Sequence, residues 1–377
     1  MAVNISTREL FSSPVVTRVV RTTVSPQDLL QRFFGLAPDS NGVNIEDKSG
    51  HDCSWDIFEN TRQLANMRAP GSGPGTRKPQ PAGHVFARIP RMHEKVPLLD
   101  EQIFRMRRLG QNPDNVDVAG QSYVVKQQEI IAQRFRNTRE FMISRMLRGS
   151  FQVKQSGDDW VPCDTGGTFT VDYQVPAGNK NQLDITGGGA AIAASWATLS
   201  TDIPTHIMTV NKYFAQTHGL PLKYAITTTA TFQAYVMNNT KMQAQAGTSN
   251  TSWQEWRMNA VPGVDGSQGF HFVVHKAIPW LTWILYDAQL EVDGTVTNVI
   301  QENHVHFLPA PQGLWVGGFN GSEMVRENRM ASSEERFGMQ AWVEPTTQPS
   351  GFEMVAVDNF LPALFIPKCI TDAVVVF

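Results

Sequence analysis

Four histidines and one glutamate lie in two short segments and have the side-chain types of a metal site. The segment QENHVHF carries Glu302, His304 and His306, and the segment FHFVVHK carries His271 and His275. Residues two apart on a strand share one face, so His304 and His306 could bind a metal ion together. Histidines on strands more often pack and form hydrogen bonds, and we expect that role and no metal site here.

Motifs that carry common catalytic chemistry are missing from the sequence. It contains no G-x-S-x-G nucleophile elbow, no H-E-x-x-H metal motif, no P-loop, and no G-x-G-x-x-G between a strand and a helix. The neighbouring carboxylates Asp158-Asp159 and Glu334-Glu335 would diverge on a strand, and we interpret them as solvated turn residues. We therefore expect no enzymatic activity, no catalytic residue and no cofactor.

Length, composition and charge indicate a globular protein. The chain has 377 residues, of which 41% are hydrophobic and 18% charged, enough to bury the cores of two or three domains. The net charge of −3 gives no overall attraction to nucleic acid or to an anionic membrane. The longest strongly apolar stretch, Ala277 to Tyr286, is about half a membrane span, and the start of the chain lacks the apolar run of a secretory signal. We expect a soluble, cytoplasmic chain.

The three cysteines are expected to be ordinary core thiols. Cys53, Cys163 and Cys369 are far apart and form no C-x-x-C pair. Their odd number argues against a disulfide framework, and their spacing argues against a zinc knuckle.

The segment from Met67 to Gly83, MRAPGSGPGTRKPQPAG, is rich in glycine and proline and could be a phosphate cradle, a linker or the tip of a loop. A phosphate cradle needs a helix after its glycines, and Pro79 and Pro81 prevent one here. The flanking runs His51–Met67 and His84–Lys95 read as extended chain. The segment is therefore predicted to be the tip of a long antiparallel hairpin, which needs outside support because a two-stranded ribbon alone is marginally stable.

Two helices are predicted in the first half of the chain. A short amphipathic helix follows Ser25 as N-cap, with Pro26 in its first turn, Asp28 in capping-box position and Gly35 as its stop. A spine helix of about 40 Å runs from Ser122 to Arg148 and ends at Gly149. The spine helix carries six basic and two acidic residues, which we interpret as a solvated face with ion pairs to other subunits rather than as a nucleic-acid site.

The second half reads as a strand meander, an α+β lobe and terminal strands. The meander covers Ser150–Pro176, and the lobe begins with a capped helix within Thr201–Gly219. Asp293-Gly294 predicts a two-residue β-hairpin inside the lobe. The strands after Gly351 are expected to return to the meander and complete one sheet with it.

This order of parts resembles the Hong Kong 97-type capsid fold, and the chain resembles the lambda-type major head protein family of tailed bacteriophages over nearly its whole length. The stretches that carry the likeness are LLQRFFG, RMLRGSFQVKQSG, VDYQVP, LYDAQLEVDGTVTNVIQENHVHFLP and QAWVEPTTQPSGFEMVAVDNFLPALF. The resemblance implies an α+β chain divided into four parts. These are an N-terminal arm (1–48), an extended β-hairpin loop or E-loop (49–95), a peripheral domain with the spine helix (96–200 and 330–377) and an axial domain (201–329).

The resemblance also implies a function, which the physical character of the parts supports. A ribbon, an arm and a helix too long for one domain all leave surface that only neighbouring copies would cover. We expect a major capsid protein that self-assembles into an icosahedral phage head around packaged double-stranded DNA, with weak non-specific DNA contact and no membrane. Alternatives are a hydrolase with a nonstandard site in the lobe at 201–329, or a tail or spike component.

The partners implied are copies of the chain in pentamers and hexamers, a scaffolding protein, a portal at one vertex and, in some particles, a decoration protein. The location implied is the virion, after assembly in the host cytoplasm. Basic residues around the extended loop would suit carboxylates of an adjoining subunit. These candidate contact residues are Arg68, Arg77, Lys78, Arg88 and Arg91.

Overall fold

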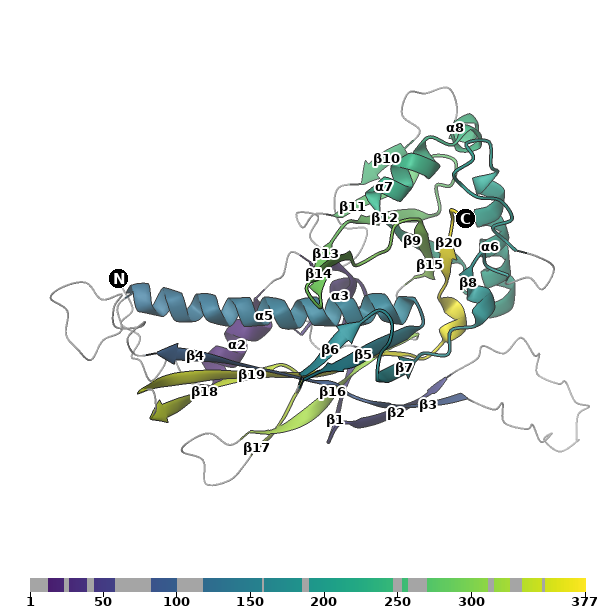
Figure 1. The fold of residues 1–377 in the computed structure, drawn as a ribbon. Coiled ribbons are helices and arrows are strands. Elements are labelled where there is room, and N and C mark those ends of the chain that lie inside the picture. Colours follow the sequence, from purple (N-terminus) through teal and green to yellow (C-terminus); the bar gives the residue numbers. More distant parts are fainter. Residues whose placement is uncertain are drawn as a thin grey trace, which may run out of the picture. The chain divides into compact units, whose positions relative to one another are not determined.

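The computed structural model describes most of the chain (Figure 1). The described residues are 13–23, 27–38, 44–57, 83–99, 118–157, 159–184, 190–246, 253–256, 270–310, 315–325, 334–347 and 350–377. The chain divides into two compact units that alternate along the sequence. Unit 1 draws on residues 1–53, 87–143 and 317–363, and unit 2 draws on residues 54–86, 144–316 and 364–377.

Unit 1 is built around a six-stranded sheet. The strands run in the order β1-β16-β19-β18, while β17 pairs with β16 and β4 pairs with β19. Their bounds are β1 Ile45–Lys48, β4 Arg91–Leu99, β16 Val316–Val325, β17 Glu334–Phe337, β18 Gln340–Thr347 and β19 Ser350–Leu364. The prediction that the strands after Gly351 join the meander is wrong, because β19 pairs with β4 and β18 instead.

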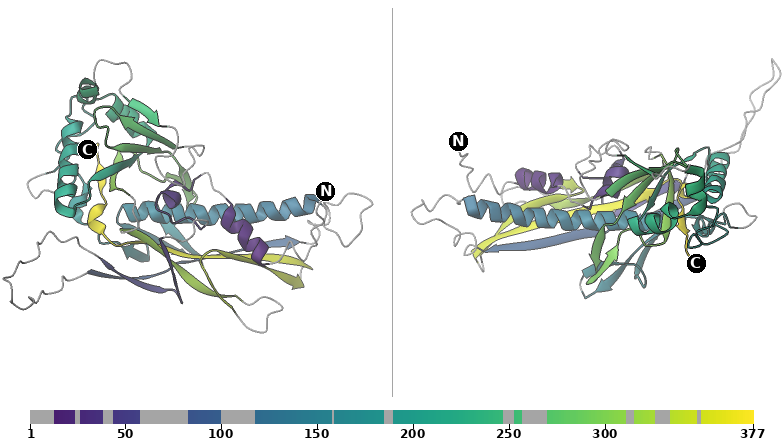
Figure 2. Two further views of the ribbon diagram at one scale, coloured as in Figure 1. Left: turned by 180° about the vertical axis from the view of Figure 1, so that it is seen from behind. Right: turned by 90° about the horizontal axis from the view of Figure 1, so that it is seen from above.

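The spine helix α5, Val118–Leu147, runs along one face of this sheet (Figures 1 and 2). Its residues Val124, Ile131 and Phe135 are buried with Met354 and Ala356 of β19 in one apolar cluster. Residues at helical spacing face the sheet because the helix repeats about every 3.6 residues. The predicted spine helix is confirmed, and its burial against β19 explains how so long a helix is stabilised.

Two short helices of the N-terminal segment also belong to unit 1. Helix α2, Ser13–Thr22, packs on β18, where the Thr17 hydroxyl donates to the carbonyl of Ala341 at 2.9 Å. Helix α3, Leu29–Phe33, begins after Asp28 as N-cap and is followed by Gly35 at φ +68°. Gly35 ends the helix as predicted, whereas the start lies later than the sequence indicated; Ser25 and Pro26 lie outside the described residues.

The long hairpin is present as a two-stranded ribbon, β2 Asp52–Ile57 with β3 Gly83–Arg88. The chain leaves β3 at Ile89 and then forms β4 in the large sheet, so the ribbon is shorter than the predicted run to Lys95. The tip of the hairpin, together with Arg68, Arg77 and Lys78, lies outside the described residues.

Unit 2 contains a seven-stranded mixed sheet in the order β10-β11-β12-β9-β15-β20-β8. The bounds are β8 Lys180–Asn181, β9 Leu222–Thr227, β10 Trp253–Trp256, β11 Phe270–His275, β12 Thr282–Tyr286, β15 His304–Pro309 and β20 Asp372–Val374. Helix α6, Ile203–His218, is capped by the Asp202 side chain and buries Ile207, Val210 and Phe214 in the core of this unit. The capped helix of the predicted lobe is confirmed.

Smaller elements complete unit 2. They are β5 Ser150–Ser156, β6 Asp159–Cys163, β7 Phe169–Asp172, the hairpin strands β13 Gln289–Val292 and β14 Thr295–Asn298, helix α7 Thr229–Thr231, a π-helical turn Phe232–Met237, helix α8 Thr240–Ala246, and single turns at Ala177–Asn179 and Pro367–Cys369. The meander is a separate three-stranded sheet, β6-β5-β7. Asp293 and Gly294 both have positive φ, 52° and 73°, which is the geometry of the predicted two-residue turn.

The three cysteines are buried and unpaired, as expected.

Among the described helices, none is both long enough and apolar enough to cross a membrane.

Candidate functional site

The β2–β3 ribbon has one face that its own chain buries and one face that it leaves open. Cys53, Trp55 and Ile57 of β2 and Val85 of β3 are buried, because alternate residues of a strand point to the same side. The indole of Trp55 donates to the carbonyl of Leu364 at 3.0 Å. The buried face therefore anchors the ribbon, and the other face is available for contacts.

The open face carries an aromatic side chain that is held in place. Phe86 is 80% exposed, the largest exposed fraction among the large apolar side chains of the described residues. The ring of His84 meets the ring of Phe86 edge to face at 4.4 Å, and Nδ1 of His84 lies 2.7 Å from a carboxylate oxygen of Asp56. In the sequence Val85 and Ala87 alternate with His84, Phe86 and Arg88, and this alternation groups Phe86 with the polar side chains on the face that the structure leaves open.

The described candidate contact residues Arg88 and Arg91 have different surroundings. Arg91, the first residue of β4, makes a two-pronged ion pair with Glu323, with nitrogen to oxygen distances of 2.8 and 2.9 Å. Arg88 is exposed on β3, on the same strand face as Phe86, and forms no ion pair within the described part of the chain. Arg88 is therefore the more available of the two cations.

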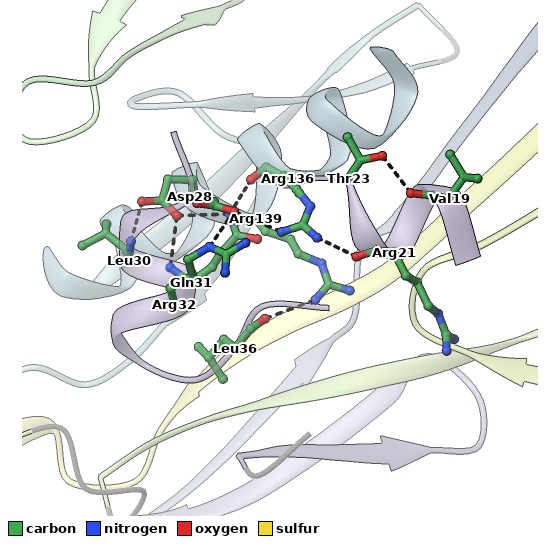
Figure 3. Close-up of polar contacts among 11 residues, drawn as sticks. Val19, Arg21, Thr23, Asp28, Leu30, Gln31, Arg32, Leu36, Arg136 and Arg139 are labelled. Atoms are coloured by element: carbon green, nitrogen blue, oxygen red, sulfur yellow. Dashed lines mark hydrogen bonds and ion pairs between the residues drawn. The ribbon is translucent and has the colours of Figure 1, made fainter. Parts of the chain in front are cut away.

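A buried polar cluster fastens the N-terminal segment to α5 (Figure 3). Arg136 donates to the carboxylate of Asp28 at 3.1 Å and to the carbonyl of Arg21 at 2.6 Å, and both ion-pair side chains are fully buried. The carboxylate of Glu140 accepts from the backbone N–H groups of Leu30 and Gln31 at 2.7 and 3.1 Å. A carboxylate from α5 thus satisfies free donors at the start of α3.

A second buried pair joins α5 to the large sheet. Arg139 donates to both carboxylate oxygens of Asp358 on β19, at 2.5 and 2.6 Å, and its guanidinium lies 4.2 Å from the ring centre of Phe360. Near the end of α5, Arg145 pairs with Asp164; burial lowers the pKa of Arg145 and Asp164 opposes that shift.

The interpretation of the basic spine residues as a solvated face is therefore wrong for Arg136, Arg139 and Arg145. They are buried and paired with carboxylates of their own chain. It holds for Arg134, which is exposed and lies 3.1 Å from Glu94. The partners come from distant sequence positions, so no local pattern pointed to these pairs.

The strand histidines have the structural role that the sequence analysis favoured. His304 lies 2.7 Å from a carboxylate oxygen of Asp372, and His306 bonds the carbonyl of Thr371 at 3.1 Å. Burial lowers the pKa of His306. Burial alone would raise the pKa of Asp372, but His306 and the hydrogen bond from His304 hold it below its usual value. Within the described residues no group of three histidine, cysteine or acidic side chains could hold a metal ion.

The carboxylate pair on β17 makes contacts within its own chain. Glu334 lies 2.8 Å from Arg336, and Glu335 accepts from the hydroxyl of Ser49 at 2.6 Å. Both are exposed strand residues rather than the turn residues expected. Of the other pair, Asp159 begins β6, and Asp158 lies outside the described residues.

Comparison with known protein families identifies the family of this chain. A family model described as phage major capsid protein E matches residues 56–375. The chain belongs to the phage major capsid protein E family. It is therefore a shell-forming structural protein of a phage capsid, and the predicted likeness to phage head proteins is confirmed.

Comparison with solved structures supports the same fold. The chain is similar to the proposed capsid protein of a prophage of E. coli CFT073, with a TM-score of 0.51 and 13% sequence identity over 78% of this chain and 79% of that chain. This match confirms the predicted α+β capsid fold of the Hong Kong 97 type. Two further similar structures are a phage-related protein from Bordetella bronchiseptica RB50 (TM-score 0.49, 9% identity, 96% of each chain) and a virus-like particle from Pyrococcus furiosus (TM-score 0.42, 9% identity, 96% of each chain). No curated protein sequence gives a significant match.

Proposed function

We propose that this capsid protein is the subunit of an icosahedral bacteriophage head that encloses packaged double-stranded DNA. The observation that carries the proposal is the family match over residues 56–375. We propose a purely structural role without enzymatic activity.

The proposed building blocks are pentamers and hexamers of the chain. A scaffolding protein would guide their assembly, a portal would occupy one vertex, and some particles would carry a decoration protein. Assembly would take place in the host cytoplasm, and the finished subunit would be part of the virion. The resemblance of the sequence to phage head proteins supports these partners.

We propose that the extended loop at 49–95 is the main contact element between subunits. Its two strands bury one face on their own chain and leave the other open, which is the behaviour of a ribbon that needs a neighbour. The proposed contact residues remain Arg68, Arg77, Lys78, Arg88 and Arg91. The other proposed parts are the arm at 1–48, the peripheral domain at 96–200 and 330–377, and the axial domain at 201–329.

The proposed contact with packaged DNA is weak. The net charge of −3 provides no overall attraction, and three arginines of the spine helix are already neutralised by carboxylates of the same chain. The isolated protein should not bind duplex DNA with submicromolar affinity at physiological salt.

Negative-stain electron microscopy of the purified protein tests the proposed function. Closed shells or capsomer rings are the expected particles. Small monodisperse particles that hydrolyse a substrate would point to a hydrolase with a site at 201–329. Tubes or fibres without closed shells would point to a tail or spike component.

A further inference from the structure

A second exposed apolar side chain lies on strand β16 of the large sheet, far from Phe86 in the sequence. Met324 of β16 is 62% exposed, although both its strand neighbours, Glu323 and Val325, are at least partly covered. It lies opposite Glu335 of β17 in the antiparallel register. Directly opposed residues share a face and touch, so Met324 and Glu335 form one small patch, apolar and acidic.

Glu335 has no cation partner within the described residues. Its carboxylate hydrogen-bonds with the side chains of Ser49 and Ser322, which orient it but add no positive charge. The neighbouring Glu334, by contrast, is paired with Arg336. Among the described residues, the Met324–Glu335 patch therefore presents an oriented carboxylate without a cation partner beside an exposed thioether.

The open face of the ribbon carries an aromatic and a basic side chain, which complement the apolar and acidic side chains of the Met324–Glu335 patch. Phe86 and Arg88 are two apart on β3 and project to the same side. Asp52 of β2 alternates with the buried Cys53 and is therefore also exposed on the open face. Asp52 and Arg88, both among the described residues, form no ion pair with each other. Within the described residues, an aromatic ring next to a guanidinium without an ion-pair partner thus matches a thioether next to a carboxylate without a cation partner.

We propose that Phe86 and Arg88 of one copy dock onto Met324 and Glu335 of a second copy of this chain. The proposal rests on the proposed function, since it names the surface of a neighbouring subunit that the ribbon contacts in a shell. Sulfur packs favourably against aromatic rings, and arginine binds carboxylates through two parallel hydrogen bonds.

Preorganisation makes Phe86 suited to be the anchor of this contact. His84 holds the ring from the side, and Asp56 holds His84, so little side-chain freedom remains to be lost on docking. Large aromatic residues in such positions commonly contribute most of the binding energy of an interface. The two patches differ, so the contact is head-to-tail, and such contacts close into rings when the rotation between copies allows it.

Thiol cross-linking tests the contact directly. Shells of the double variant Phe86→Cys/Met324→Cys are treated with bismaleimidoethane and examined on a denaturing gel. A ladder of multiples of the 42.0 kDa chain is expected, because each copy joins the next around a capsomer. The single variants should give only the monomer band, since the three native cysteines are buried. The matched control is Phe86→Cys/Val296→Cys, which places the second thiol at another exposed apolar residue, 64% exposed on β14.

The outcomes distinguish failure of the docking contact from failure of the proposed function. Shells without a ladder, a ladder in the Val296 control, or dimers from Phe86→Cys alone would overturn the docking contact and leave the proposed function standing. Failure of the unmodified chain to form any shell or ring overturns the proposed function, and the docking contact with it.

Charge exchange provides a second measurement that needs no cysteine. Arg88→Glu and Glu335→Arg should each raise the protein concentration needed for assembly by about tenfold, because each places like charges face to face. The double variant Arg88→Glu/Glu335→Arg should return this concentration to within about twofold of the unmodified chain, since the pair is restored in reverse. Additive losses in the double variant would contradict the contact.

Discussion

Three arginines of α5 are buried because carboxylates from distant parts of the chain meet them. Arg136 meets Asp28 and Arg139 meets Asp358, and all four side chains are at most 1% exposed. An isolated buried charge is strongly unfavourable, and a buried pair recovers that cost only with good geometry and further hydrogen bonds. These pairs therefore fix where the N-terminal segment and β19 lie on α5 more than they add stability.

Removing one partner of the Arg139–Asp358 pair should be more damaging than removing both. Arg139→Met leaves the Asp358 carboxylate buried without a cation and should lower the free energy of unfolding by about 3–5 kcal/mol. The double variant Arg139→Met/Asp358→Leu should recover most of this loss, because no buried charge remains. Urea unfolding followed by tryptophan fluorescence measures both. Equal losses in the single and double variants would show that the contact of Arg139 with Phe360 matters more than the ion pair.

His275 should make the protein sensitive to acid. It is fully buried at the end of β11, and burial lowers its pKa to about 4. Between pH 6.5 and 4 the unfolded chain binds a proton that the folded chain does not, so stability falls as the pH falls, by up to about 3 kcal/mol in total. Above pH 6.5 the side chain is neutral in both states and contributes no pH dependence.

The matched variant for this prediction is His275→Asn. Nδ1 of His275 accepts a hydrogen bond from the backbone N–H of Ala277 at 3.2 Å. The side-chain oxygen of an asparagine at position 275 can accept from the same N–H group. The variant cannot take up the proton. Its unfolding free energy should therefore fall less than that of the unmodified chain between pH 7 and pH 4.5. Parallel pH profiles of the two proteins would assign the acid sensitivity elsewhere.

At the scale of elements, glycine fixes the end of α5. Gly149 has φ +92°, a conformation that residues with a Cβ rarely adopt. A Cβ at this position would also lie 3.0 Å from the Cβ of Val175 and 2.8 Å from Nζ of Lys180. The lysine end can move aside, but Val175 belongs to the chain that follows β7 and cannot move without its backbone.

Gly149→Ala should therefore lower the free energy of unfolding by about 2–3 kcal/mol, from backbone strain and the contact with Val175 together. Gly157→Ala is the matched control, because Gly157 also has positive φ, +64°, and a Cβ at that position would meet nothing within 4 Å. The control should lose only about 1 kcal/mol. Thermal unfolding by circular dichroism measures both. Equal losses would mean that strain alone determines the cost at Gly149.

Elements with a strong local pattern were predictable from the sequence, and pairings between distant strands were not. The spine helix, the helix ending at Gly219 and the turn at Asp293-Gly294 each follow from spacing and turn chemistry. The partners of β19 do not, because its apolar run fits a strand buried in any sheet. The same limit applies to the site in part. Alternation groups Phe86 with His84 and Arg88, but the burial of the opposite face depends on contacts between distant residues, such as that of Trp55 with Leu364.

At the scale of the whole molecule, the chain passes back and forth between the two compact units several times. Unit 1 takes three separate stretches of sequence and unit 2 takes another three, so a search for one boundary in composition or linkers cannot separate them. Motifs in their order along the chain indicated the fold family, and the family match confirms it. The chain crossings themselves are visible only in three dimensions.

Mature shells should be held together without covalent bonds between subunits. Some shells of the Hong Kong 97 type join a loop lysine to an asparagine of a neighbouring subunit, and in this chain Lys78 and Asn359 lie in the corresponding regions of sequence. Asn359 is fully buried in β19, where its amide nitrogen lies 3.3 Å from the carbonyl of Ser322 and 3.4 Å from the carboxylate of Glu323. It is also paired with Arg91 in the register of β4 and β19.

A lysine from another copy could reach that amide only if β4 or β16 moved away, which would break the ion pair of Arg91 with Glu323 and the strand pairing on that side. We therefore expect mature particles to give one band at 42.0 kDa on a denaturing gel. The cross-linked Phe86→Cys/Met324→Cys particles provide the positive control for a ladder on the same gel. A ladder from untreated particles that disappears in an Asn359→Asp variant would show that the strand opens during maturation and that Asn359 reacts.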